Sequence, residues 1–296
     1  MIKALTLGLV LMSCASFAQS KSHSSDFTAE WSFTKGIEGP GVNSHRDLFV
    51  VNYQKQGTIG LVKQDGTCSI FAELPAGSIG NGIRFDHEDN MYIADYTGHN
   101  ILKIASGQNS ATIFVHNDQM NQPNDIAIAP NGTIYASDPN WKDNSGQIWM
   151  ITTDQKIVLI QPKMGTTNGI EVSPDGKFLY VNESIQRKVW RFKILSDGEL
   201  TNKTLFFEFP DYGMDGMRCD RKGNLYIARY DKGTVAVLSP KGKMIDEILL
   251  KGKKPSNITF GGSDGKTCYV TLADRGCLEI FRAKYAGREF IKLRKK

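Results

Sequence analysis

The sequence predicts an all-β fold, a six-bladed β-propeller with four-stranded blades. Three observations predict it: one unit recurs six times, each unit divides into short strands separated by turns, and no long helical periodicity competes. Repeats of about 40 to 50 residues that carry several strands each are typical of propeller blades.

The six units start 42 to 47 residues apart, and each has a polar first residue and an aromatic residue eleven or twelve positions later. Two clear copies are NGIRFDHEDNMYIAD from Asn81 and NDIAIAPNGTIYASD from Asn124. The six first residues, called the openers below, are Glu38, Asn81, Asn124, Asn168, Asp215 and Asn257. The aromatic residues are Phe49, Tyr92, Tyr135, Tyr180, Tyr226 and Tyr269.

The strands of each unit can be assigned in order. A turn rich in Asp, Asn and Gly, such as Asn131-Gly132, follows the first strand and favours a hairpin. The second strand carries the aromatic residue, and the third reads TIGLV, NILKI, QIWMI, KVWRF, TVAVL or CLEIF. A fourth strand follows in five units only: SIFAEL, ATIFVH, KIVLI, LFFEF and DEILL. We expect DFTAEWSF (26–33) to complete the sixth blade and close the ring.

The N-terminus has the pattern of a secretory signal peptide. One lysine precedes an apolar run from Ala4 to Met12, and small residues precede Gln19. The predicted division is therefore a signal peptide at 1–18 and a single propeller domain at 19–296, in a periplasmic or secreted protein. A lipid anchor at Cys14 is the alternative, because LMSC resembles a lipobox. No later segment is apolar enough to predict a membrane span.

Composition limits the remaining choices. Of the 296 residues, 40% are hydrophobic and 23% are charged, which predicts a folded chain. The net charge of +5 is scattered apart from the tail KLRKK (292–296), predicted to be a solvated end, so no nucleic-acid partner is expected. No cysteines form a CxxC pair, which argues against a zinc cluster. Cys268 and Cys277, on successive strands of one hairpin, could pair in an oxidising compartment.

The openers suggest a site on the propeller axis. The first strand of each blade lines the central channel, so six openers from distant parts of the chain converge. A single Asn or Asp at a strand start commonly caps a turn. Six openers that converge are harder to explain in this way. Two of them are carboxylates and none is Cys or His, a set of ligands that suits a hard divalent cation. Because Ca²⁺ accepts a variable number of oxygen ligands, we expect Ca²⁺ at this site, with Zn²⁺, Mn²⁺ or Mg²⁺ as other choices. Without an ion, the two carboxylates would raise each other's pKa.

Several short motifs occur in order at blade spacing: Glu38-Gly39-Pro40, Pro123-Asn124-Asp125, Asn168-Gly169-Ile170, Asp215-Gly216-Met217 and Phe260-Gly261-Gly262. With this set, roughly residues 36–283 resemble the gluconolactonase/senescence-marker-protein/luciferin-regenerating-enzyme family, whose relatives include calcium-dependent diisopropylfluorophosphatases. The resemblance implies a six-bladed propeller hydrolase with one catalytic divalent ion. Glu38, Asn168 and Asp215 match the family's metal ligands, and Asp215 also matches its general base. Asn124 and Asp125 match its substrate pocket.

The predicted function is that of a secreted, metal-dependent lactonase in which the metal polarises the carbonyl and Asp215 acts as base on a small-molecule substrate. Asn81 and Asn257 are expected to line the substrate pocket with Asn124 and Asp125, and the aromatic residues Tyr53, Tyr96, Trp141 and Tyr230 to shape its mouth.

One position departs from the family pattern. Gln122 stands where sugar-lactone members often carry Arg, and Arg84 or Arg229 could replace it. Two alternatives stay open: a phosphotriesterase-like hydrolase on the same metal site, and a non-catalytic ligand-binding or interaction module with structural calcium. We expect a monomer.

Overall fold

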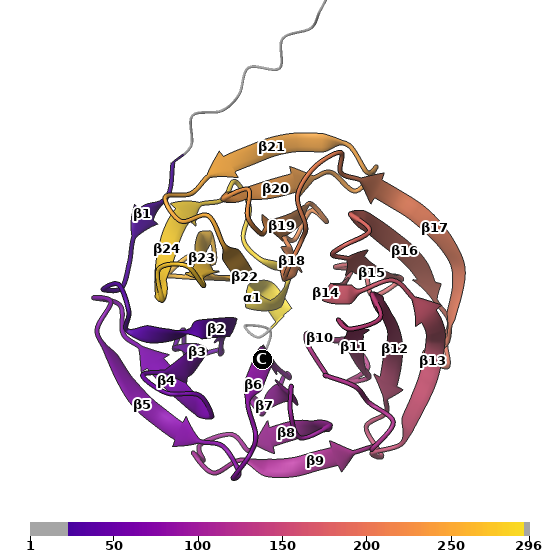
Figure 1. Cartoon of the computed structure of the whole chain (residues 1–296), viewed down its shortest axis with the longest axis horizontal. Coiled ribbons are helices and arrows are strands. Elements are labelled where there is room, and N and C mark those ends of the chain that lie inside the picture. Colours follow the sequence, from indigo (N-terminus) through magenta and orange to yellow (C-terminus); the bar gives the residue numbers. More distant parts are fainter. Residues whose placement is uncertain (1–22, 293–296) are drawn as a thin grey trace, which may run out of the picture.

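The computed structural model describes residues 23–292, so the predicted leader at 1–18, Cys14 and most of the basic tail lie outside the described residues. Six four-stranded antiparallel sheets surround a central channel (Figure 1), which confirms the predicted six-bladed propeller. Each sheet is one blade, with its first strand beside the channel and its fourth at the rim.

The blades follow the sequence around the ring. Blade 1 contains β2 (Phe33–Val42), β3 (Leu48–Tyr53), β4 (Thr58–Val62) and β5 (Cys68–Glu73). Blade 2 contains β6 (Gly80–Phe85), β7 (Met91–Asp95), β8 (Asn100–Ile104) and β9 (Thr112–His116). Blade 3 contains β10 (Ile126–Ile128), β11 (Ile134–Asn140), β12 (Ser145–Ile151) and β13 (Ile157–Met164). Blade 4 contains β14 (Thr167–Val172), β15 (Phe178–Glu183), β16 (Lys188–Ile194) and β17 (Leu200–Glu208). Blade 5 contains β18 (Met217–Cys219), β19 (Leu225–Arg229), β20 (Thr234–Leu238) and β21 (Met244–Leu249). Blade 6 contains β22 (Pro255–Gly261), β23 (Thr267–Leu272), β24 (Cys277–Arg282) and β1 (Ser25–Asp26).

The turns follow the predicted chemistry. Gly132 and Gly176 end the first hairpin turn of blades 3 and 4 with φ values of 88° and 74°. A side chain at these left-handed positions would be strained, so Asn-Gly and Asp-Gly sequences suit them.

The core lies between neighbouring blades. The aromatic residue of every unit is buried. Tyr92 of blade 2, for example, packs in one cluster with Ile126 and Trp149 of blade 3. Burial of such clusters around the whole ring holds the openers' strands in place.

The ring closes as predicted, through a shorter strand. Ser25 and Asp26 form the strand and lie opposite Ile280 and Glu279 of β24, and Phe27 N–H still donates to the backbone oxygen of Leu278 at 2.9 Å. The predicted strand extended to residue 33, but Phe33 already begins β2 beside the channel. Trp31 and Phe33 donate to the backbone oxygens of Arg275 and Gly276, so the chain follows blade 6 until it enters blade 1.

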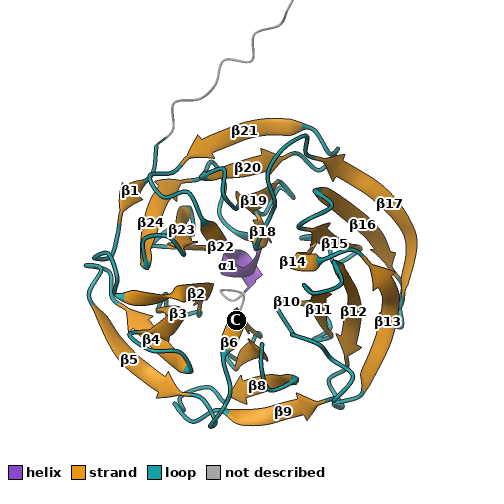
Figure 2. Cartoon of the chain, viewed as in Figure 1, coloured by secondary structure: helices purple, strands orange, loops and turns teal. Residues whose placement is uncertain are grey.

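The repeat pattern predicts no strand after β24, and the predicted solvated end at 292–296 lies mostly outside the described residues. After β24 the chain turns back and forms a short helix, α1 (Arg288–Lys292), at the centre of the ring (Figure 2). Of the described helices, none is long and apolar enough to cross a membrane.

The described cysteines are all free, and Cys268 and Cys277 lie opposite Phe281 and Leu272 rather than each other.

Candidate metal centre and active-site cavity

One end of the channel holds a cavity of about 460 Å³. Five openers line it: Glu38, Asn81, Asn124, Asn168 and Asp215. They come from five different blades, so the structure brings together residues that are up to 177 positions apart in the sequence (215 − 38). The sixth opener, Asn257, contacts Glu38 but is not part of the lining.

Backbone irregularities direct the openers into the channel. The pairing register of the first two strands shifts beside Glu38, Asn81, Asn168 and Asn257. In blades 3 and 5 the first strand begins only after the opener, at Ile126 and Met217. A bulge or a late strand start frees a residue from the alternating pleat, so its side chain can be aimed at the axis.

The first carboxylate of the site belongs to Glu38, which is only 7% exposed. Its Oε2 accepts hydrogen bonds from the backbone N–H of Gly39 at 2.7 Å and from Nδ2 of Asn257 at 2.9 Å. Burial raises the pKa of Glu38 to about 7, and the nearby negative charge of Asp125 adds to the effect. Two donated hydrogen bonds oppose the shift without cancelling it.

The second carboxylate belongs to Asp215, which opens onto the cavity. Burial raises its pKa well above the ordinary range, and the charge of Glu38 is the next cause. The side chains of Glu38 and Asn168 are both within hydrogen-bonding reach of the Asp215 carboxyl group. The backbone C=O of Asp215 accepts a hydrogen bond from Nδ2 of Asn182 at 2.6 Å, which fixes the loop before β18.

This arrangement fits a divalent cation. Two carboxyl groups that share a buried space repel each other when ionised, and a cation removes that repulsion. The Oδ1 atom of Asn168 is buried beside them and has no hydrogen-bond partner. Carboxylate and amide oxygens are the donors that hard cations prefer. Among residues 23–290, no group of three or more His, Cys, Asp or Glu could hold a metal, so an ion here depends on the amide oxygen as well.

Asp125 and Asn257 lie beneath the cavity and not in its lining. Asp125 is fully buried and pairs with Arg84 at 3.0 Å and with Arg218 at 3.5 Å. Asn257 donates to Glu38 and its Oδ1 accepts from Nη1 of Arg218 at 3.3 Å. Asp125 therefore positions Arg84 and Arg218, and Asn257 positions Glu38.

The upper walls are partly aromatic. Tyr96, Trp141 and Tyr230 line the cavity as expected, whereas Tyr53 packs against Phe33. Neither Arg84 nor Arg229 lines the cavity. The guanidinium of Arg229 pairs with Asp211 at 2.9 Å and lies over the Phe209 ring, and that of Arg84 pairs with Asp125. Neither arginine therefore replaces the one that sugar-lactone members often carry at the position of Gln122.

Sequence reasoning missed a set of buried polar residues on the second strands. Asn52 donates to the backbone oxygens of Gly36 and Gly80, and so links the inner strands β2 and β6. The sequence pattern that could have revealed this set is a polar residue two or three positions after the repeated aromatic residue. These residues are Asn52, Ser137, Asn182 and Thr271.

The chain is similar in sequence and in fold to known proteins. The family model described as "SMP-30/Gluconolactonase/LRE-like region" matches residues 38–274. A gluconolactonase of Zymomonas mobilis is 26% identical over 68% of this chain and 64% of its own length. Regucalcin of Xenopus laevis is 30% identical over 55% of this chain and 58% of its own length, so the matches span less than two thirds of these curated relatives. The crystal structure of a calcium-binding protein, regucalcin, from Agrobacterium tumefaciens superposes with a TM-score of 0.77 at 18% identity, covering 90% of this chain and 96% of that one. That similarity shows the fold.

Proposed function

The chain belongs to the SMP-30/gluconolactonase/LRE-like family, and we propose that it is a divalent-metal-dependent hydrolase of a small-molecule cyclic ester. The observation that carries the proposal is the meeting of buried Glu38, half-buried Asp215 and the unpartnered Asn168 oxygen at the cavity. The gluconolactonase relative supports lactone hydrolysis, and the calcium-binding regucalcin relatives support a divalent ion.

Glu38, Asn168 and Asp215 would hold the ion, with Ca²⁺ as the first choice and Zn²⁺, Mn²⁺ or Mg²⁺ as other choices. When bound, such an ion supplies a Lewis acid that polarises the carbonyl of the lactone.

The protein's own groups would supply the proton transfers. Asp215 takes a proton from the water that attacks the carbonyl carbon and returns it to the ring oxygen when the C–O bond breaks. Burial raises the pKa of Asp215 in the metal-free protein, and a bound cation would favour the ionised carboxylate that can accept the proton. Asn168 orients the Asp215 carboxyl group. Asn81 donates to the backbone oxygen of Asn124 at 3.0 Å, which fixes the cavity wall where a substrate hydroxyl can bind.

Replacement of Asp215 by Asn tests the proposal. We expect Asp215→Asn to lower lactone turnover on the order of 10²- to 10⁴-fold, because an amide cannot accept the water proton. The matched control is Asp118→Asn, whose side chain is 92% exposed, and it should keep full activity. The assay uses a panel of aldonolactones, acyl lactones and phosphotriesters, each with chelator and with added Ca²⁺, Mg²⁺, Mn²⁺ or Zn²⁺.

The panel also separates the alternatives. Turnover of phosphotriesters in place of lactones would identify the phosphotriesterase-like hydrolase, and ion binding without turnover of any substrate would identify a binding module. Full lactonase activity in Asp215→Asn would refute the role of this residue. We also propose, on the leader pattern at 1–18 alone, that the protein is exported.

A further inference from the structure

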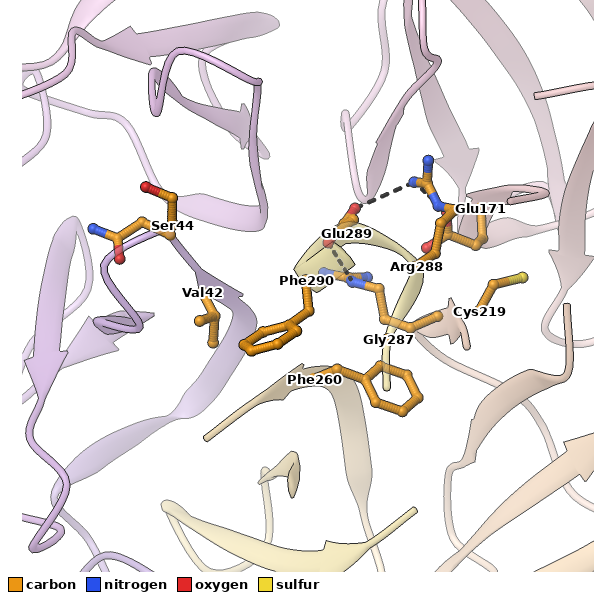
Figure 3. Close-up of a pocket in the computed structure, with 11 residues that line it drawn as sticks. Val42, Ser44, Glu171, Cys219, Phe260, Gly287, Arg288, Glu289 and Phe290 are labelled. Atoms are coloured by element: carbon orange, nitrogen blue, oxygen red, sulfur yellow. Dashed lines mark hydrogen bonds and ion pairs between the residues drawn. The ribbon is translucent and has the colours of Figure 1, made fainter. Parts of the chain in front are cut away.

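The C-terminal segment enters the channel at the end away from the cavity. Val42 and Cys219, the last residues of β2 and β18, face Gly287, Arg288 and Phe290 there (Figure 3). These groups leave a space of about 10 Å³, room for about one water molecule. The channel below the candidate metal centre is therefore sealed by the chain's own C-terminal segment.

Short contacts anchor this segment to blades 5 and 6. Gly287 N–H donates to the backbone oxygen of Gly265 at 3.0 Å, and Arg221 N–H donates to that of Ala286 at 2.8 Å. A Cβ atom at Gly287 would lie 2.4 Å from Cβ of Phe260, so only glycine permits this approach.

The segment brings two charges into the channel. Arg288 is buried and pairs with Glu171 at 2.6 Å, while its other terminal nitrogen donates to the backbone oxygen of Ile128. Glu289 lies 3.3 Å from Nε of Arg84 and 4.0 Å from Nε of Arg218, the two arginines that also hold Asp125. Both arginines are at most 2% exposed.

Among the described residues, the charges in this layer balance. Its three guanidinium groups belong to Arg84, Arg218 and Arg288, and its three carboxyl groups to Asp125, Glu171 and Glu289. Asp125 lies against both central arginines, and Glu171 pairs with Arg288. Glu289 contacts both central arginines and also lies 3.3 Å from Nη2 of Arg288, so it supplies the third negative charge. Without Glu289, whose side chain is 26% exposed, the described groups of the layer would carry one net positive charge, which is costly because the arginines themselves are buried.

This layer connects directly to the candidate metal centre. Arg218 donates to Oδ1 of Asn257 at 3.3 Å, and Asn257 donates to Glu38 at 2.9 Å. We propose that Glu289 is the counter-charge that lets two buried arginines lie beneath a cation site, so that the C-terminal segment sets the metal affinity of the centre. The proposal rests on the metal site of the proposed function. Glu289 is a positioning residue, since it acts through Arg84 and Arg218.

The size of the effect follows from Coulomb's law. A net positive charge left in this layer repels a divalent ion at the site, and a repulsion of about 1.4 kcal/mol corresponds to a tenfold loss of affinity. Glu289→Gln should therefore weaken Ca²⁺ binding on the order of tenfold. Glu289→Asp keeps the charge and should retain most of the affinity. Arg288→Gln removes a positive charge from the same layer, so its affinity should stay the same or rise.

The experiment is a calorimetric Ca²⁺ titration of each chelator-treated, full-length protein, with thermal unfolding of the metal-free form measured alongside. Glu88→Gln is the matched control, because the Glu88 side chain is 70% exposed and its charge is screened. Its affinity should equal that of the wild type.

Only Glu289→Gln is expected to weaken Ca²⁺ binding, and this difference between the two variants separates a charge effect from a general loss of packing. Weaker binding by both Glu289→Gln and Arg288→Gln would overturn the inference, because loss of packing would explain it. Unchanged affinity in Glu289→Gln would also overturn it. A wild-type protein that binds none of Ca²⁺, Mg²⁺, Mn²⁺ or Zn²⁺ would instead refute the metal site of the proposed function.

Discussion

Replacement of Glu38 by Gln should stabilise the metal-free protein at alkaline pH while removing a metal ligand. The cause is the pKa of Glu38, which burial raises from 4.5 to about 7. Because the folded-state value lies above the unfolded one, protonated Glu38 favours the fold at low pH. This contribution is lost as pH rises from about 4.5 through about 7. Above pH 7 the wild-type fold must keep a buried charge that glutamine does not carry.

The structure sets the expected magnitude. A rise in pKa from 4.5 to about 7 corresponds to about 3 kcal/mol in the free energy of unfolding. Glutamine can still accept the hydrogen bonds that Gly39 and Asn257 donate to Glu38, so few other interactions change. At pH 8, metal-free Glu38→Gln should therefore unfold about 6 to 12 °C above the wild type.

The assay is thermal unfolding by circular dichroism in excess chelator at pH 8 and pH 5. The difference between the two proteins should shrink towards zero at pH 5, where the wild-type carboxyl group is already protonated. Glu73→Gln is the matched control, since Glu73 is exposed and pairs only with Lys55 at the surface. Lower stability of Glu38→Gln at pH 8, or an equal difference at both pH values, would refute the reasoning.

Three further predictions address the ion, the packing beneath it and the leader. Calorimetric Ca²⁺ affinity of the wild type should fall as pH drops from 8 to 5.5, because protons compete for Glu38, whose pKa is about 7; a constant affinity would contradict the assigned ligand. Gly216→Ala should lower the free energy of unfolding in urea by about 1 to 3 kcal/mol, because its Cβ atom would lie 2.0 Å from Cγ of Asn257, the residue that holds Glu38. Mass spectrometry of the exported protein should find Gln19 at the mature N-terminus, and a lipid-modified Cys14 would show the alternative processing.

The propeller could be predicted because its signal is repeated. Six units with the same polar opener and the same buried aromatic residue fix the number of blades, even where a single copy such as that from Glu38 is irregular. Ring symmetry then predicts that Glu38 and Asp215, 177 residues apart, approach each other (215 − 38). The structure places both at one cavity.

Other features could not be predicted, because no repeat specifies them. Asp125 and Asn257 belong to opener motifs, yet bulges and strand starts decide which side chain of each motif reaches the cavity. The buried pairing of Arg84 with Asp125 depends on depth along the channel, which sequence spacing does not give. The segment that carries Arg288 has no counterpart in other blades, and only five residues of it are helical.

The central claim is that oxygens from three blades hold one divalent ion on the propeller axis. Crystals grown with Mn²⁺ and measured for anomalous scattering test it most directly. The account predicts one anomalous peak within bonding distance of side-chain oxygens of Glu38, Asn168 and Asp215. A lactone-hydrolysing protein whose only peak lies elsewhere, or that shows none, would contradict it.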